Sequence, residues 1–378
     1  MPTNVLYITG IVIAGFLSLI LLTKKHKTAG DHILAAWLAL TGLHLLAYYL
    51  FLIGEHIHYP NLVGIGFSLP LAQGPFLFIY TKVQTSARGF RARYLLHFIP
   101  LVLSIGMFGE YFLYSHSEKM EVFKNDGAPF QLQSLINLIA LSISGVVYII
   151  LSLITLLRYR KQLPENFSNI ERIRFNWLLY LIIWLSIIWL IILFIQNDPL
   201  IFGAAVCFVL WIGYYGMRQV QVFHTHPTVQ RAQSGDVEKP ISEENGSGDS
   251  NPKYQNSSLS ESEAMAIHQR LFKLLDESAP YKDPELTLSD LANMLDVHPN
   301  HLSQVINSIE HKSFYDLINE RRIAAFLKLL EQPDQQQYTF LALAFSCGFN
   351  SKASFNRNFK KFTGSTPSEY QKQGLKPE

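Results

Sequence analysis

The run of apolar residues from Trp177 to Phe194 constrains this chain more strongly than any other part of the sequence. It contains no charged side chain and a single serine. As an α-helix, it would extend for about 27 Å at roughly 1.5 Å per residue, close to the roughly 30 Å of a bilayer's hydrocarbon core. Because lipid offers no hydrogen-bond partners to an open backbone, such a segment is stable there as a helix. The run therefore predicts a transmembrane helix.

Similar apolar stretches occur throughout the first 223 residues, and together they predict seven membrane spans. We place these spans near 4–23, 33–53, 61–83, 94–114, 131–157, 175–196 and 199–217. The third span is the weakest, because Pro70, Gln73, Gly74 and Pro75 interrupt it. Residues 1–223 are therefore expected to form a seven-helix transmembrane bundle in a lipid bilayer.

The positive charges between the spans indicate how the chain is oriented, because cytoplasmic loops are enriched in Lys and Arg. The opposite loops contain only Lys119 and Lys124. One set of loops contains twelve such residues: Lys24, Lys25, Lys27, Lys82, Arg88, Arg91, Arg93, Arg158, Arg160, Lys161, Arg172 and Arg174. This asymmetry places the N-terminus outside and the C-terminal half in the cytoplasm. The first apolar run precedes its positive charges, so it is expected to be a span and not a cleavable signal peptide.

The composition changes sharply after residue 223. Residues 224–258 show no apolar periodicity and are rich in Ser, Gly, Asn and Glu, which predicts a disordered acidic and polar linker. Residues 259–378 show helical periodicity and no strand signals. They are therefore expected to form a separate, soluble all-α domain.

The first of two related patterns in this domain lies near residues 287–308. Thr287 and Asp290 have the spacing of a capping box, which predicts the start of a helix. The chain is expected to turn at 296–297, and a second helix to begin at Pro299. A helix-turn-helix of this kind places its second helix in the major groove of DNA. The polar residues left on the outer face of that helix are His298, Asn300, His301 and Gln304.

The second pattern lies near residues 339–362 and repeats the first. The Leu-Ala pair at 291–292 recurs at 343–344, Gly348 is expected to form the turn, and Asn350 to cap the following helix. The outward residues of that helix are Lys352, Ala353, Asn356, Arg357 and Lys360. Between the two patterns, residues 314–331 predict one long helix of about 27 Å. Such a spacer would set the two recognition helices about one DNA turn apart.

Five short segments of this domain carry a resemblance to a known family. They are Leu291-Ala292, His298–Ser303, Ile318–Ile323, Cys347–Asn350 and Phe355–Tyr370. In this order and spacing, residues 260–370 resemble the DNA-binding domain of the AraC/XylS family of bacterial transcription regulators. The resemblance implies sequence-specific binding to double-stranded promoter DNA, and it admits RNA polymerase and a second copy of the chain as protein partners. It also implies that the membrane is the bacterial cytoplasmic (inner) membrane.

The two recognition helices differ in charge. Family members often carry an Arg or Lys on the first one, whereas residues 298–307 contain neither. The first unit is thus expected to recognise bases through Asn300, His301 and Gln304. Residues 264–378 contain 13 basic and 13 acidic residues, but no acidic residue lies between positions 335 and 368. The second unit is therefore expected to neutralise most of the phosphate charge. Its basic residues are Lys352, Arg357, Lys360 and Lys361.

Polar residues inside the predicted spans are candidates for sensing a signal, because polar groups in hydrocarbon are often functional. Hydrogen bonding between helices is the alternative role. An anchor needs only one helix, and this chain has seven predicted spans. The hypothesis is therefore a one-component sensor of an unknown signal ligand, and the alternative is a tether and dimerisation surface. The candidate sensing residues are His44, Gln73, Glu110 and Asn137.

The sequence contains no residue set that is typical of catalysis. There is no convincing nucleophile–base set, phosphate-binding loop or metal cluster, so neither enzyme activity nor a cofactor nor a metal is expected. Cys207 and Cys347 lie in different halves and are expected to be small buried residues. A different class of protein remains the alternative: a membrane transporter or enzyme with a helical regulatory tail that does not bind DNA.

Overall fold

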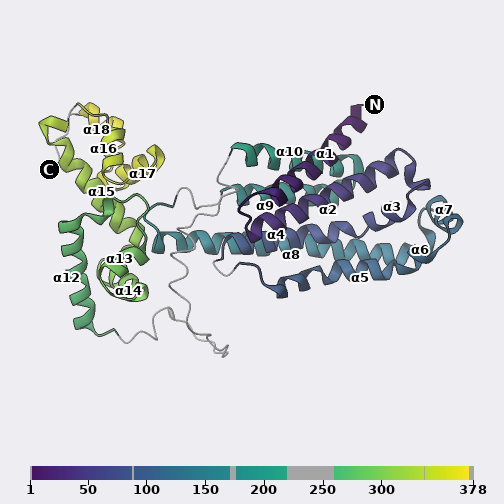
Figure 1. Ribbon diagram of the computed structural model, residues 1–378, viewed down its shortest axis with the longest axis horizontal. Coiled ribbons are helices and arrows are strands. Elements are labelled where there is room, and N and C mark those ends of the chain that lie inside the picture. The colour runs from purple at the N-terminus through teal and green to yellow at the C-terminus, as the bar shows by residue number, and fades with distance from the viewer. Residues whose placement is uncertain (1, 87–88, 171–175, 219–258, 336, 374–378) are drawn as a thin grey trace. The chain divides into compact units, whose positions relative to one another are not determined.

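The computed structural model describes residues 2–86, 89–170, 176–218, 259–335 and 337–373 (Figure 1). These residues form helices and connecting turns without a β-strand, which confirms the predicted all-α fold for this part of the chain. The chain divides into two compact units. The first comprises residues 1–158 and 176–226, and the second comprises residues 159–175 and 227–378. The predicted linker 224–258 lies outside the described residues.

Five described helices are long and apolar enough to cross a membrane, and they coincide with five of the predicted spans. Many of their large apolar side chains are exposed, as expected for helices that face lipid. Cys207 is also exposed, contrary to expectation. Their length and composition suggest association with a membrane. The helices are α1 (Pro2–Thr23), α2 (Ala29–Leu52), α8 (Gln131–Asn166), α9 (Asn176–Leu190) with the π-helical turn η5 (Ile191–Ile195), and α10 (Asp198–Arg218).

The other two predicted spans are broken in the structure. The segment 61–83 forms α3 (Pro60–Gly66), η2 (Leu69–Ala72) and α4 (Gln73–Gln84), with a bend of 45°. Pro70 lies at this break, where its missing N–H and fixed φ favour a new helix start. The segment 94–114 forms η3 (Ala92–Phe98), α5 (Ile99–Met107) and α6 (Gly109–Leu113). Among the described residues there are thus five candidate spans, or six if the bent pair is one span, and a shorter apolar helix at 92–107.

Small residues allow the helices of the first unit to approach closely. α2 packs against α1, α4 and α10. At its crossing with α1, a methyl group on Gly42 would lie 3.2 Å from the Cβ of Ala14. At Gly145 in α8, any side chain would collide with the indole of Trp189 in α9. Small residues at such crossings are typical of helix packing in membranes. The connections contain η1 (Glu55–Ile57), α7 (His116–Lys124) and η4 (Ala128–Phe130).

The second unit contains seven described α-helices in addition to the end of α8, and the 3-10 helices η7 (Pro280–Lys282) and η8 (Pro333–Gln335). The α-helices surround two apolar cores. The first core contains residues of α12, α13 and α14, and the second contains residues of α16 and α17. α15 contributes to both, through Ile318 to the first and Phe326 to the second. The seven helices are α12 (Glu261–Ser278), α13 (Leu288–Met294), α14 (Pro299–Ile309), α15 (Phe314–Leu330), α16 (Phe340–Ser346), α17 (Lys352–Thr363) and α18 (Pro367–Gln373).

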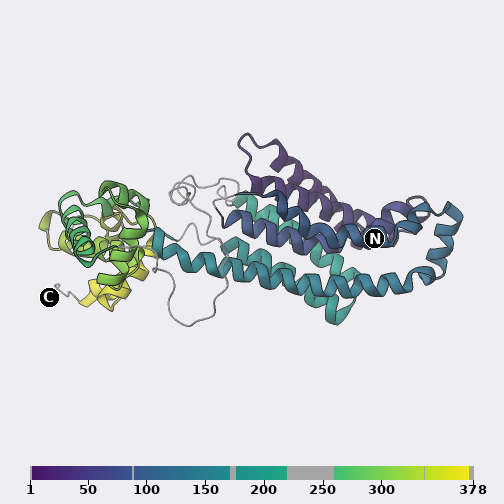
Figure 2. The same ribbon diagram turned by 90° about the horizontal axis from the view of Figure 1, so that it is seen from below.

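The second unit also includes a segment that the sequence analysis assigns to the membrane domain. α8 is one unbroken helix in both views (Figures 1 and 2), yet its last residues from Tyr159 onward group with the C-terminal unit. The second compact unit therefore comprises the end of α8 in addition to the C-terminal part of the chain.

Candidate functional site

α13 and α14 form the first helix-turn-helix unit. Thr287 caps α13: its Oγ1 accepts a hydrogen bond from the Asp290 amide at 3.1 Å, and the Asp290 carboxylate accepts one from the Thr287 amide at 3.2 Å. At the other end, the Val297 amide donates to the carbonyl of Ala292 at 3.0 Å, which is the bond of a Schellman turn. Asp296 occupies the left-handed position of this turn, with a φ of 53°.

α16 and α17 repeat this arrangement. The Phe349 amide donates to the carbonyl of Ala344 at 3.1 Å, which is the same Schellman bond. Gly348 holds the left-handed position with a φ of 97°, so the turn predicted at this glycine is confirmed. Two helix pairs 52 residues apart therefore share one turn geometry, and this geometry fixes how each second helix leaves the first.

The outer face of α14 carries the residues that are predicted to contact bases. His298 caps the helix, since its Nδ1 accepts a hydrogen bond from the Asn300 amide at 3.2 Å. His298 and Asn300 are exposed, and His301 and Gln304 are partly exposed. The opposite face is buried in the first core through Leu302, Val305 and Ile306. The polar face is thus left outside the core, and its contact with DNA stays a prediction.

α17 presents the positive residues. Its cap is Ser351, whose Oγ accepts a hydrogen bond from the Ser354 amide at 3.2 Å, so the cap predicted at Asn350 is one residue too early. Only the extended backbone of Ser351 brings a side-chain oxygen over the first turn. The side chains predicted to contact DNA lie away from the core. Lys352, Ala353, Arg357 and Lys360 are exposed, and Asn356 is partly exposed.

Two further residues of α17 hold it on α15, and one of them was missed by sequence reasoning. Asn358 is buried, and its Nδ2 donates to the Tyr315 hydroxyl at 2.7 Å. Lys361 forms an ion pair of 2.6 Å with Asp316. Asn358 lies where a helical pattern expects an apolar residue, and no local signal identifies its partner. Lys361 is exposed like Lys352 and Lys360, but its charge is paired with a carboxylate of the protein.

With this geometry established, residues 291–373 match the family model described as "Helix-turn-helix domain". The C-terminal part is a helix-turn-helix domain. A stretch of 102 residues is also 24% identical to "Probable transcription factor PqrA" of Proteus vulgaris, covering 27% of this chain and 81% of that protein. No solved structure matches the chain. The expected resemblance is thus supported for the helix-turn-helix domain.

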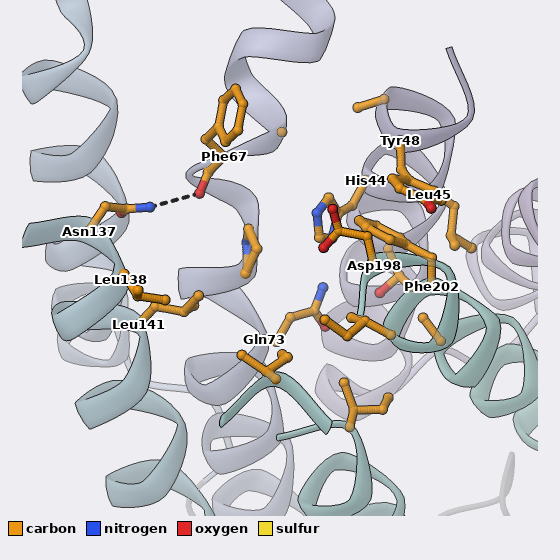
Figure 3. A pocket seen from close by; sticks show the side chains of 18 of the residues that line it. His44, Leu45, Tyr48, Phe67, Gln73, Asn137, Leu138, Leu141, Asp198 and Phe202 are labelled. Carbon is orange, nitrogen blue, oxygen red and sulfur yellow. Dashed lines mark hydrogen bonds between the residues drawn. The ribbon is translucent and has the colours of Figure 1, made fainter. Parts of the chain in front are cut away.

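The first unit contains a cavity of about 570 Å³ (Figure 3). Of the four candidate sensing residues, His44, Gln73 and Asn137 line it. Glu110 does not: it is exposed on α6, and its carboxylate accepts a hydrogen bond from Tyr114 at 3.2 Å. A polar residue's position within a predicted span therefore did not show whether the residue lines the cavity.

Two of the three cavity residues also make bonds between helices, which is the alternative role considered above. The Gln73 Oε1 accepts a hydrogen bond from the Trp37 indole at 2.6 Å, and the Asn137 Nδ2 donates to the Phe67 carbonyl at 2.9 Å. His44 differs from these two residues. The centre of its ring lies 4.9 Å from the centre of the Phe202 ring in an edge-to-face arrangement, and it has no hydrogen-bond partner within the described part of the chain.

Sequence reasoning missed Asp198, which also lines the cavity. Asp198 lies one turn before Phe202 on α10, so its carboxylate belongs to the same end of the cavity as the His44 ring, as Figure 3 shows. The cavity therefore combines a largely apolar wall with an imidazole and a carboxylate at one end. Its size is typical of pockets that hold small organic molecules, which measure roughly 300–1,000 Å³.

Proposed function

We propose that this protein is a membrane-anchored, sequence-specific DNA-binding transcription regulator of bacteria. The observation that carries the proposal is the repeated helix-turn-helix geometry, in which α14 and α17 each follow the same Schellman turn and keep a polar face outside the core. In such motifs the second helix enters the major groove. Double-stranded promoter DNA is therefore the proposed partner of both helices.

We propose that α14 mainly contacts bases and that α17 mainly contacts phosphates. α14 offers amide and imidazole side chains and no positive charge, which suits hydrogen bonding to base edges, with Asn and Gln pairing well with adenine. α17 offers Lys352, Arg357 and Lys360, which suit phosphate contact. Base preference would then reside mainly in α14, and salt dependence mainly in α17.

The first unit is proposed to cross the cytoplasmic membrane seven times, with the N-terminus outside. The bent pair α3–α4 would form the third span, and η3, α5 and α6 together the fourth. The positive loops then face the cytoplasm, as the distribution of Lys and Arg requires. The DNA-binding unit would thereby lie in the compartment that contains DNA.

The first unit is further proposed to sense a small molecule through its cavity. A ligand with an apolar body and one hydrogen-bonding group fits a wall that is mostly apolar and ends at His44 and Asp198. If the unit were only a tether, no such molecule would bind in the cavity.

The DNA proposal is tested by selecting bound sequences from random duplex DNA with the full chain in lipid nanodiscs. We expect an enriched site in two parts about one DNA turn, roughly 34 Å, apart.

Gln304→Ala should relax the preference at one half-site by about 1–3 kcal/mol per base pair. Arg357→Ala should weaken binding at all sequences and reduce the salt dependence by about one phosphate contact. Lys328→Ala, an exposed lysine on α15, is the charge-matched control and should change neither. Absence of any enriched sequence would instead favour the transporter or enzyme with a non-binding tail.

The cavity proposal is tested with decanol and decanoic acid as probes, each added separately to the full chain and followed by native mass spectrometry. One bound probe molecule is expected in the unchanged chain. Ala205→Trp, which fills the cavity from α10, should abolish this binding. Glu110→Leu changes a residue outside the cavity and should leave it intact. Equal binding by both variants would mean that the probe sits elsewhere and would favour the tether.

A further inference from the structure

Residues 159–170, which we name the docking segment, pack inside the DNA-binding unit although they are the end of α8 and the residues that directly follow it. Tyr159, Leu163, Phe167 and Ile170 form a buried apolar cluster with Tyr315 of α15. Leu163 and Phe167 retain only 2% and 6% of their exposure. The segment therefore contributes core residues and not merely a surface contact.

The backbone of the docking segment pairs with the start of the first helix-turn-helix unit. Phe167 forms an isolated antiparallel bridge with Thr287, the residue that caps α13. Ser168 is fully buried, and its Oγ donates to the carbonyl of Leu286 at 2.6 Å. The segment thus fixes the residues immediately before α13.

Ser168 also contacts a buried cation. Arg322 of α15 is 1% exposed and donates to the carbonyls of Tyr281 and Asp283, each at 2.7 Å. It also donates to the carbonyl and the Oγ of Ser168, at 3.2 and 3.0 Å. Asn319, which is also buried, donates to the same carbonyl at 3.0 Å. A buried guanidinium needs acceptors for its donors, and the docking segment supplies two of them.

The docking segment also reaches the first recognition helix. The Glu165 carboxylate accepts a hydrogen bond from the side-chain Nδ2 of Asn307 at 3.1 Å, near the end of α14. One short segment therefore contacts the residue that caps α13, the end of α14 and the middle of α15. Any displacement of the segment would act on all three.

We propose that the docking segment is a permanent part of the DNA-binding unit, and that α8 and this segment transmit the state of the membrane helices to the recognition helices. α8 carries cavity-lining residues near its start, among them Asn137 and Leu141, and the first docking residues at its end. A ligand that shifts α8 would thus act on the DNA-binding unit through the helix itself. The transmission role rests on the proposed function, whereas the structural role does not.

The structural role is tested by hydrogen exchange of the full chain in nanodiscs, a measurement that requires no DNA. Leu163→Ala is expected to speed exchange of the α15 amides by roughly 30-fold or more, which corresponds to the low end, about 2 kcal/mol, for a buried Leu→Ala change. Phe167→Ala should act on the same amides. Gln162→Ala, an exposed neighbour on α8, is the matched control and should have no effect. Unchanged protection of α15 in Leu163→Ala would overturn the proposal.

A cross-link tests permanence and transmission without weakening the fold. Glu165→Cys with Asn307→Cys, in a Cys207→Ser and Cys347→Ala background, would be joined by a short bismaleimide, with N-ethylmaleimide as the control reagent. We expect rapid joining and retained binding to the selected DNA site, together with an unchanged response of that binding to a cavity probe. No joining, or loss of DNA binding on joining, would show that the segment undocks and would overturn its permanence. If the chain binds no DNA at all, hydrogen exchange and the joining rate still decide the structural role.

Discussion

Gly348→Ala is expected to destabilise the second helix-turn-helix unit by roughly 3–5 kcal/mol. The φ of 97° is costly for alanine, at about 1–2 kcal/mol. The added methyl group would also collide with the Tyr281 carbonyl oxygen and lie 2.9 Å from the Arg322 Nε. It would therefore disturb a hydrogen bond from a buried cation, which contributes about 1.5–3 kcal/mol. Hydrogen exchange of α16 and α17 in the full chain, and loss of binding to DNA, would measure the effect.

Two other positive-φ positions serve as controls for Gly348. Gly364 has a φ of 79° with no atom within 4 Å of an added Cβ, so Gly364→Ala should show only the backbone strain, about 1–2 kcal/mol. Asp296→Gly changes the equivalent position of the first unit. It should alter the free energy of unfolding by no more than about 1 kcal/mol, because glycine relieves the strain of the positive φ but makes the unfolded chain more flexible. Equal costs for Gly348→Ala and Gly364→Ala would contradict the close approach of Tyr281 and Arg322.

Arg322→Met is expected to destabilise the DNA-binding unit by at least about 3 kcal/mol. Burial lowers the pKa of Arg322 to about 10, so the side chain remains charged at neutral pH. Its removal leaves the carbonyls of Tyr281 and Asp283 without this donor, and each unsatisfied buried acceptor costs about 1–3 kcal/mol. The measurement is hydrogen exchange across α15 and across the docking segment, both of which should lose protection.

The neighbouring arginine provides the matched control. The Arg321 guanidinium forms an ion pair with the Asp276 carboxylate at 2.8 Å and lies 4.7 Å from the Phe272 ring centre. This contact is partly exposed, so Arg321→Met should cost about 1 kcal/mol or less. A large loss in Arg321→Met, or a small one in Arg322→Met, would contradict the assignment of the buried cation as a structural centre.

The local signals of the sequence predicted most of the second unit. Capping pairs, glycine and proline act within a few residues, so the start of α13 at Thr287 and the turn at Gly348 agree with the structure. The cap of α17 is displaced by one residue, because Asn350 and Ser351 are both suitable capping residues and only the backbone conformation decides between them. Hydropathy located the long apolar helices for the same reason. The interruption that the sequence indicates between Pro70 and Pro75 agrees with the bend in the third predicted span, whereas the break within the fourth was not foreseen.

These local signals could not predict contacts between residues that are far apart in the sequence. Ser168 and Arg322 are 154 positions apart, and nothing near Ser168 marks it as a partner of a buried cation. The meeting of His44 with Phe202, and the place of Asp198 in the same cavity, likewise depend on how α2 and α10 pack. Glu110 has the polarity of its companions but lies on a short exposed helix. Polarity within a span identified candidates, and tertiary packing decided which of them share a cavity.

The docking segment makes the DNA-binding unit discontinuous along the chain, because α9 and α10 intervene between Ile170 and α12. A gene fragment that begins after residue 218 would encode every helix of the helix-turn-helix domain but lack the acceptors that Ser168 offers to Arg322. Exchanging this domain with that of another regulator would therefore require exchanging the docking segment as well. The segments of the two units alternate along the sequence, so a fusion at a single position would not transfer either unit complete.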